Sequence, residues 1–247
     1  MDIRIFKVLY LFIFVSVSSI SCQKERANGI YDYKTLGTSA RDLLSSSIYS
    51  SLKIQISYMP GFEPDSITTN AVSVFLNTFL NKPDGIQISK QCILESGKEV
   101  IDLSEIVDIE KKNRSTFTSG SQIAIHILIT DSYFSNSQVF ANSYWNTSIC
   151  IFGRSVSDNS GRLGQIGRTD LLITLIEHEL GHLMGLVNQG SPMQVEHLDS
   201  LHSDHCDNPK CLMYYRQNPD NYGIINNYTV PELDSNCKND LKANGGK

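Results

Sequence analysis

The sequence predicts an α+β domain with a mixed, twisted sheet of about four to five strands and helices packed on it. Two observations predict this class. Segments whose apolar residues alternate with period two are interspersed with segments of helical spacing, and turn residues separate them. The strand-like segments are 52–58, 86–89, 122–130, 138–145 and 148–153. The clearest helical segments are 66–80, 169–184 and, near the end of the chain, 229–241.

The first half of the chain opens with a strand, a helix and a second strand. Residues 52–58 alternate apolar and polar side chains. Residues 66–80 place apolar side chains on one helical face, with Ser66 as the expected N-cap. After a turn, residues 86–89 begin the second strand, and residues 102–112 favour a short helix or an irregular excursion.

The middle of the chain holds the strongest strand. Residues 122–130 are almost continuously apolar, which is typical of a central strand buried on both faces. His126 lies inside this strand, so we expect a core histidine there rather than a metal ligand. Residues 138–145 and 148–153 predict a hairpin, and residues 153–167 predict a glycine-rich loop.

The helix predicted over residues 169–184 carries the most specific chemical pattern, His-Glu-Leu-Gly-His at residues 178–182. His178 and His182 lie one turn apart on one face, so both imidazoles can bind one Zn²⁺ at roughly 2.0–2.1 Å. Glu179 lies beside them, where a carboxylate can take a proton from a water activated by the metal. Apolar flanks make a chance occurrence unfavourable, because ionisable groups would be buried without benefit.

A zinc site needs a third protein ligand, and the sequence downstream resembles a known family. Gly185 follows the second histidine by three residues, as in metzincin peptidases, but Asn188 stands where their third histidine is expected. Residues 205–213, His-Cys-Asp-Asn-Pro-Lys-Cys-Leu-Met, are similar in every spacing to an archaemetzincin segment that begins with a ligand histidine. The resemblance therefore implies His205 as the third ligand and residues 188–204 as an inserted loop.

The same resemblance implies further roles. In metzincins a methionine makes a tight Met-turn beneath the metal, and Met213 holds that place. A tyrosine two residues later approaches the metal in some of them, which points to Tyr215 as an oxyanion donor, with simple aromatic packing as the alternative. The predicted order of elements also resembles the metzincin layout, whose edge strand binds extended substrate, here residues 140–144.

A gluzincin arrangement is an alternative for the third ligand. It would use Glu196 on a second helix that begins near Ser191. That arrangement explains neither the glycine turn nor the methionine segment. His197 and His202 are further candidates on the same loop, and His205 remains the preferred ligand.

Six cysteines in an exported chain indicate an oxidising compartment. Archaemetzincins place a Cys-x-x-Cys pair near the C-terminus, and its thiolates join two earlier cysteines in a second zinc site. This chain has Cys237 and Asp240 there, which leaves a second metal open. A disulfide between Cys206 and Cys211 is then the simpler use of those thiols. Sequence does not fix connectivity. A further candidate pair is Cys92 with Cys150.

The N-terminus has the layout of a secretory signal. Residues 1–21 combine two basic residues with a short apolar run and small residues, and the stretch before Cys22 resembles a relaxed bacterial lipobox. We therefore expect a lipid-anchored protein of the bacterial cell envelope, at the outer membrane, on its periplasmic face or the cell surface. An ordinary cleaved signal peptide is the alternative. Residues 22–48 predict a tether or an inhibitory pro-segment, and residues 49–247 predict the folded domain.

Length and charge limit the classes of partner. The 247 residues suit one domain with a tether, and we expect a monomer. A net charge of −5 without a basic block argues against nucleic acid. The expected partners are a peptide or protein substrate and, through the lipid, a membrane.

Together with the resemblance, these residues predict a zinc-dependent endopeptidase. One catalytic zinc ion is expected on His178, His182 and His205, with Glu179 as the general base. A non-catalytic zinc-binding surface lipoprotein is the main alternative, and a zinc hydrolase of non-peptide substrates is another. Because a structural zinc site needs no base, Glu179 favours the enzyme.

Overall fold

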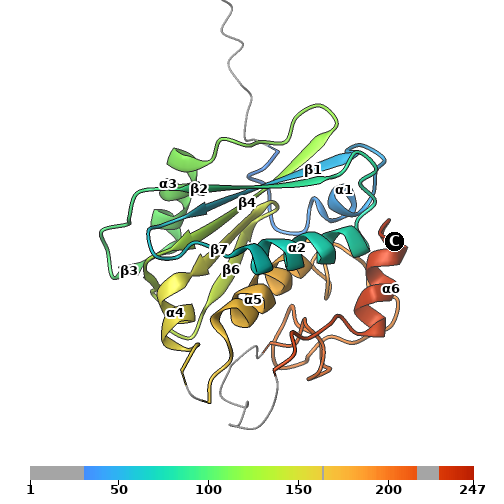
Figure 1. Cartoon of the computed structure of the whole chain (residues 1–247). Helices are drawn as coiled ribbons and strands as arrows, with labels where there is room; N and C mark the ends of the chain where they lie inside the picture. Colours follow the sequence, from blue (N-terminus) through green and yellow to red (C-terminus); the bar gives the residue numbers. More distant parts are fainter. Residues whose placement is uncertain (1–30, 163, 216–227) are drawn as a thin grey trace, which may run out of the picture.

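The computed structural model describes residues 31–162, 164–215 and 228–247. Their centre is a five-stranded sheet of order β2-β1-β4-β7-β6 (Figure 1). Neighbouring strands are parallel except β6, which runs antiparallel to β7 at one edge. The predicted α+β class and mixed sheet are confirmed, and the predicted edge strand is β6. The strands are β1 (Ser51–Tyr58), β2 (Ile86–Cys92), β4 (Gln122–Thr130), β6 (Ala141–Trp145) and β7 (Ser148–Phe152).

Three of the six described helices, α2, α3 and α6, begin after an aspartate whose side chain caps them. Asp65 caps α2 by accepting the backbone N–H of Thr68 at 2.7 Å, one residue before the predicted Ser66. Asp102 caps α3 in a capping box completed by Glu105. The helices are α1 (Ala40–Leu44), α2 (Ser66–Phe79), α3 (Leu103–Asn113), α4 (Gly153–Asp158), α5 (Arg168–Leu183) and α6 (Ser235–Ala243).

The two faces of the sheet are covered by different helices. On one face α2 and α5 lie side by side (Figure 1) and pack in one cluster with Ile127 and Ile129 of β4. Leu128, between them in sequence, points to the opposite face, where it clusters with Ile106 of α3. The continuous apolar run of β4 therefore serves both faces, as predicted for a central strand.

His126 lies within β4 and is fully buried. Its Nε2 is 2.9 Å from the Ser57 hydroxyl on β1. Burial, followed by the nearby Arg114 cation, lowers the pKa of His126 well below its usual value, so the ring is neutral. This position agrees with the prediction of a core histidine.

Three local features differ from the sequence prediction. Residues 153–167 were expected as a loop, but α4 forms at their start, because Val156 packs into the core. The C-terminal helix α6 begins only at Ser235, since Asp234 caps it by accepting the backbone N–H of Cys237. A two-stranded ribbon of β3 (Val100–Ile101) and β5 (Tyr133–Phe134) is too short for periodicity to predict.

Residues 31–48 belong to the folded domain. The buried guanidinium of Arg114 lies 3.1 Å from the Asp32 carboxylate. The Lys82 ammonium donates to three backbone carbonyls between residues 42 and 49, at 2.5–2.8 Å. Residues 31–48, which fall within the predicted tether or pro-segment, are therefore fixed to the domain by buried charges. The predicted signal peptide and Cys22 lie outside the described residues.

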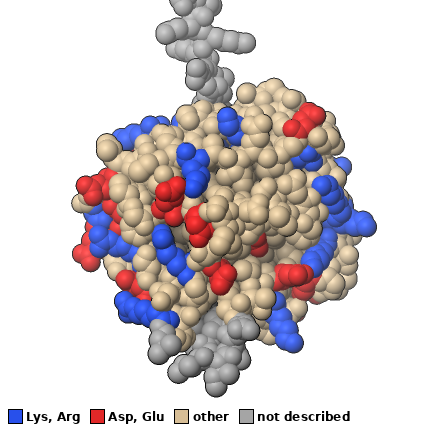
Figure 2. Space-filling view, viewed as in Figure 1, with Lys and Arg blue, Asp and Glu red and all other residues tan. Residues whose placement is uncertain are grey.

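The surface shown in Figure 2 mixes both signs of charge. Lys and Arg side chains are interspersed there with Asp and Glu side chains. Within the described residues, no helix combines the length and the apolar character needed to cross a bilayer. The exclusion of nucleic acid stays a prediction.

Candidate metal centre

Three imidazoles converge at the C-terminal half of α5. His178 and His182 lie one turn apart on the helix, and their Nε2 atoms are 3.1 Å from each other. His205 comes from the long segment after α5, and its ring centroid lies 5.3 Å from the centroids of both other rings. One nitrogen from each ring falls within a group whose members are all within 4.8 Å, which suits a single bound cation.

Hydrogen bonds set the tautomers of two of these rings. The Nδ1–H of His178 donates to the Leu212 carbonyl at 2.7 Å, and the Nδ1–H of His205 donates to the Ser203 carbonyl at 2.9 Å. In both rings Nε2 is then left with a lone pair. Backbone carbonyls that accept from the far nitrogen of an imidazole are the usual support of metal-ligating histidines.

The rings are held in the neutral form that a metal requires. Burial lowers the pKa of His178 to about 4. Burial, then repulsion from the other two rings, lowers the pKa of His182 well below its usual value, and burial lowers that of His205. Neutral rings with converging lone pairs repel one another unless a cation lies between them, and the nitrogen set suits zinc.

Glu179 lies between the two helical histidines in sequence and is itself buried. Its carboxylate accepts a hydrogen bond from the Ser143 hydroxyl at 2.6 Å. Burial raises the pKa of Glu179 to about 7, and the Ser143 hydrogen bond works against this rise. A carboxyl group with such a pKa can both accept and return a proton near neutral pH.

Met213 packs directly against the helix beneath the histidines. A Cβ atom added at Gly181 would lie only 2.3 Å from the Met213 sulfur, so the glycine in the His-Glu-Leu-Gly-His pattern makes room for the methionine. The backbone N–H of Cys206 donates to the Met213 carbonyl at 2.8 Å. This bond joins the methionine turn to the residue that follows His205.

The histidines and Glu179 face a cleft of about 970 Å³. The segment from residue 137 to residue 143, which includes the start of β6, lines the cleft, and so do Gln189 and Asp204 of the inserted loop. Tyr215 also lines the cleft, and its ring stacks on His202 with centroids 3.3 Å apart. Tyr215 therefore lies at the cleft, as an oxyanion donor would, and it also packs against another ring, as the alternative of aromatic packing expects.

The other candidate ligands lie elsewhere. His197 is buried and its Nε2 is 2.8 Å from the Asp240 carboxylate. His202 is held by Asp199 at 2.9 Å. Glu196 is exposed, and the segment after Ser191 is not helical. The structure therefore brings none of these side chains to the histidine cluster, and the helix needed for a gluzincin arrangement is missing from this described segment.

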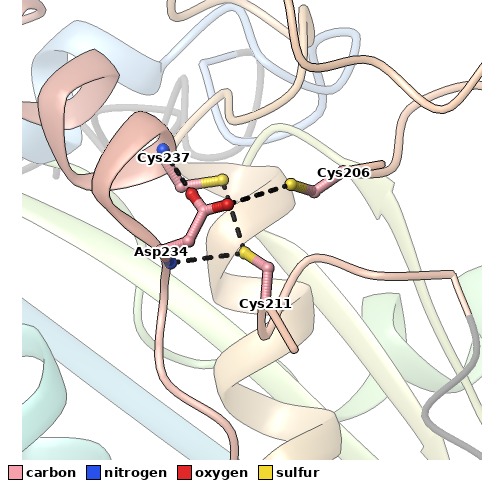
Figure 3. Close-up of side chains that lie close together, drawn as sticks. All are labelled: Cys206, Cys211, Asp234 and Cys237. Atoms are coloured by element: carbon pink, nitrogen blue, oxygen red, sulfur yellow. Dashed lines mark hydrogen bonds between the residues drawn. The ribbon is translucent and has the colours of Figure 1, made fainter. Parts of the chain in front are cut away.

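A second group of side chains that could hold a metal comes from residues 206–211 and 234–237. Cys206, Cys211, Cys237 and the carboxylate of Asp234 offer ligand atoms that are all within 4.8 Å of one another (Figure 3). The Cys211 and Cys237 sulfurs are 3.6 Å apart, and the Cys206 sulfur is 3.5 Å from the Asp234 carboxylate. Asp240, expected at this place from the sequence, instead accepts from His197 and from the backbone N–H of Gln194.

The predicted disulfides are wrong. The described cysteines, Cys206 and Cys211 included, are free thiols. Cys206 and Cys211 both turn toward Asp234 and Cys237 on another segment, so their sulfurs meet at a shared point instead of pairing. Cys92 is exposed and Cys150 is buried, so this predicted pair does not form either.

Hydrogen bonds within the thiol cluster shift the pKa values of its cysteines in opposite directions. Hydrogen bonds from the Cys206 and Cys237 thiols, joined by the backbone N–H groups of Asp234 and Met213, lower the pKa of Cys211. The same hydrogen bonds among the three thiols raise the pKa of Cys237, and they raise the pKa of Cys206 to about 12. Three sulfurs and a carboxylate that converge in a mostly buried place favour a cation there, and soft sulfur ligands suit zinc.

Two residues of these sites were missed by sequence reasoning. Asp234 forms an Asp-x-x-Cys spacing with Cys237, and this is the spacing of the expected Cys-x-x-Cys pair, so one signal was present. Ser143 lies within the predicted edge strand, but no local pattern ties it to Glu179, because the two are 36 positions apart.

No family model matches this sequence, and no curated protein matches it. Among solved structures, the fold is similar to an archaemetzincin from Methanopyrus kandleri at 16% identity and a TM-score of 0.48, over 79% of this chain and 96% of that one. A metalloproteinase-II from Bacteroides fragilis is similar at 14% identity and a TM-score of 0.44, over 88% of this chain and 57% of that one. Both identities and both scores are low, so a function for this protein has to rest on its own residues.

Proposed function

We propose that this protein is a zinc-dependent endopeptidase. The observation that carries the proposal is the joint placement of three neutral imidazoles and the buried carboxylate of Glu179 in one open cleft. Three protein ligands facing a cleft leave a coordination position for substrate or water, which is the mark of a catalytic rather than a structural zinc site.

The three histidines and Glu179 have different parts in the reaction. His178, His182 and His205 would hold the ion through Nε2. When bound, zinc supplies Lewis acidity that polarises the scissile carbonyl and favours water as a nucleophile. Glu179 takes the proton from the attacking water and then delivers it to the nitrogen of the leaving amine. A carboxyl pKa of about 7 suits both steps.

The edge strand β6 suits a peptide substrate. One side of β6 is paired with β7, and no other described strand pairs with its outer side. Unpaired backbone N–H and C=O groups can bind an extended peptide as an added strand. Because residues before and at the start of β6 also line the cleft, a peptide added there would pass Glu179.

A second cation is part of the proposal. Cys206, Cys211, Cys237 and Asp234 would hold it away from the cleft. Cys206 directly follows His205, and Leu212, whose carbonyl accepts from His178, directly follows Cys211. A closed, four-ligand site at this place would fix the third histidine and the carbonyl that orients the first.

The test is cleavage of an unstructured protein such as casein by purified protein, together with measurement of bound zinc. Cleavage should need zinc, should stop with chelator and should return when zinc is restored. A protein that binds zinc at the histidines yet cleaves no peptide would instead support the non-catalytic lipoprotein. Cleavage of esters or sugars but never of peptides would support the non-peptide hydrolase.

The lipid anchor on Cys22 stays a proposal of its own. An acylated chain expressed in a bacterium should sediment with membranes, and Cys22→Ala should be released from them or remain unprocessed. Recovery of the unaltered protein entirely in the soluble fraction would contradict the anchor and would leave the peptidase proposal untouched.

A further inference from the structure

Ser143 on the edge strand reaches across to the base of the proposed reaction. Its Oγ lies 2.6 Å from Oε2 of Glu179 and 3.1 Å from the backbone carbonyl of the same residue. A serine hydroxyl has one proton, and the shorter contact has the length of an O–H donor to a charged carboxylate. The hydroxyl therefore donates to Oε2, in a buried place.

The local shape of β6 fixes where this hydroxyl points. Ser143 pairs with Ile149 of β7, but Trp145 pairs with Ser148, so the strand has a bulge at Tyr144. The Tyr144 hydroxyl donates to the buried carboxylate of Glu110 in α3. Bulges next to active sites commonly re-aim side chains. Here the two neighbouring hydroxyls bind carboxylates of α5 and α3, helices that belong to separate core clusters, and these bonds hold the strand in place.

We propose that Ser143 is a positioning residue that holds Glu179 in the orientation needed for proton transfer, an inference that rests on the proposed endopeptidase function. The Ser143 bond occupies Oε2. None of the described residues donates a hydrogen bond to Oε1, and Glu179 lines the cleft, so Oε1 is the oxygen available to a water there.

The hydrogen bond from Ser143 also links Glu179, the proposed base, to β6, the strand that would bind the peptide. A peptide that pairs with β6 takes its position from the strand's backbone, while the side chain of Ser143 sets the base from the same strand. Reacting groups placed by one rigid element keep their relative geometry, and small misplacements reduce rate sharply.

The test compares substitutions of Ser143 by kinetics. Ser143→Ala should lower kcat on the order of 10-fold, with KM and bound zinc unchanged, because substrate and metal contacts are kept. Ser143→Thr and Ser143→Val provide a pair of equal shape that differs only in the hydroxyl, and Thr should retain activity that Val loses. Ser157→Ala, an exposed serine on α4, is the control for the same chemical change and should match the parent.

A double substitution separates positioning from general destabilisation. Glu179→Asp shortens the side chain by one methylene, which should break the contact between the carboxylate and the Ser143 hydroxyl. Adding Ser143→Ala to Glu179→Asp should then lower kcat no further, since the two effects act through one bond.

Each remaining outcome overturns a definite statement. If the parent cleaves peptide and Ser143→Ala has the same kcat, the positioning role of Ser143 is overturned and the proposed peptidase function is not. Equal kcat values of the Ser143→Thr and Ser143→Val variants overturn the same role. Loss of zinc or a raised KM in all three variants overturns it too, in favour of a structural role. A zinc-loaded parent that cleaves no peptide overturns the proposed function and this inference with it.

Discussion

The two candidate metal sites differ in the number of protein ligands that they offer and in their exposure to the cleft. The histidine cluster, His178, His182 and His205, has three neutral ligands and opens on a cleft. The thiol cluster, Cys206, Cys211, Cys237 and Asp234, offers four ligands, one of them a carboxylate, and its three cysteines are buried. Adjacent residues, His205 and Cys206, belong to different groups. A three-ligand zinc site leaves a position for water or substrate, whereas a four-ligand site leaves none, so we expect chemistry only at the histidine cluster.

The largest effect should come from replacing Glu179, because only the histidine cluster needs a general base. Glu179→Gln should lower kcat on the order of 10²–10⁴-fold, because the proton acceptor is lost while the three imidazoles remain. Bound zinc should be unchanged in both groups, which serves as the internal control. A kcat equal to that of the parent would show that Glu179 is not the general base.

The third ligand can be tested by its loss. His205→Ala should weaken zinc binding at the histidine cluster by more than about 100-fold, since even substitution of a ligand's supporting partner commonly costs 10–100-fold. The matched control is His202→Ala, whose ring lies three residues away and is held by Asp199. Competition with a chromophoric chelator measures both. Full zinc binding by His205→Ala would show that another residue completes the open site.

Acid should destabilise the metal-free histidine cluster. The pKa of His178 is about 4 in the folded protein, against 6.5 for an unperturbed histidine of the unfolded chain, so the unfolded chain binds more protons between these values. Stability present above pH 6.5 is therefore lost as pH falls toward 4, by about 3 kcal/mol for this residue.

Denaturant unfolding of the metal-free protein at several pH values measures this loss. His178→Gln should remove the share of this one residue, about 3 kcal/mol, from the change between pH 6.5 and 4, because glutamine does not titrate there. A dependence as steep in the variant as in the parent would assign the acid sensitivity to other groups.

The smallest effect should come from strengthening the closed site. Asp234→Cys would complete four thiols, and zinc should dissociate more slowly, by about 10-fold, since thiolate is the softer ligand. Peptide cleavage should stay at the parent level. Asp240→Cys is the instructive control, because Asp240 binds His197 and should not add a ligand. If zinc dissociates more slowly from Asp240→Cys than from Asp234→Cys, then Asp240 and not Asp234 is the fourth ligand.

Much of the candidate site could be predicted because it depends on local geometry. Helical spacing alone puts His178 and His182 on one face and Glu179 beside them. The match of residues 205–213 to a known spacing then led to His205, which the structure brings to the other two rings. The prediction failed for the cysteines, because the spacing between Cys206 and Cys211 says nothing of which distant segment their sulfurs meet.

What the sequence by itself determined are the features set within a few residues: the apolar run of β4, the turn-by-turn placement of ligands on α5 and most of the element boundaries. Tertiary structure alone decided the pairing of Ser143 with Glu179, the choice of Asp234 over Asp240, and the anchoring of residues 31–48 by Arg114 and Lys82. Helix and strand patterns repeat with fixed short periods, whereas contacts between remote segments depend on how the whole sheet, its bulge and its loops pack together.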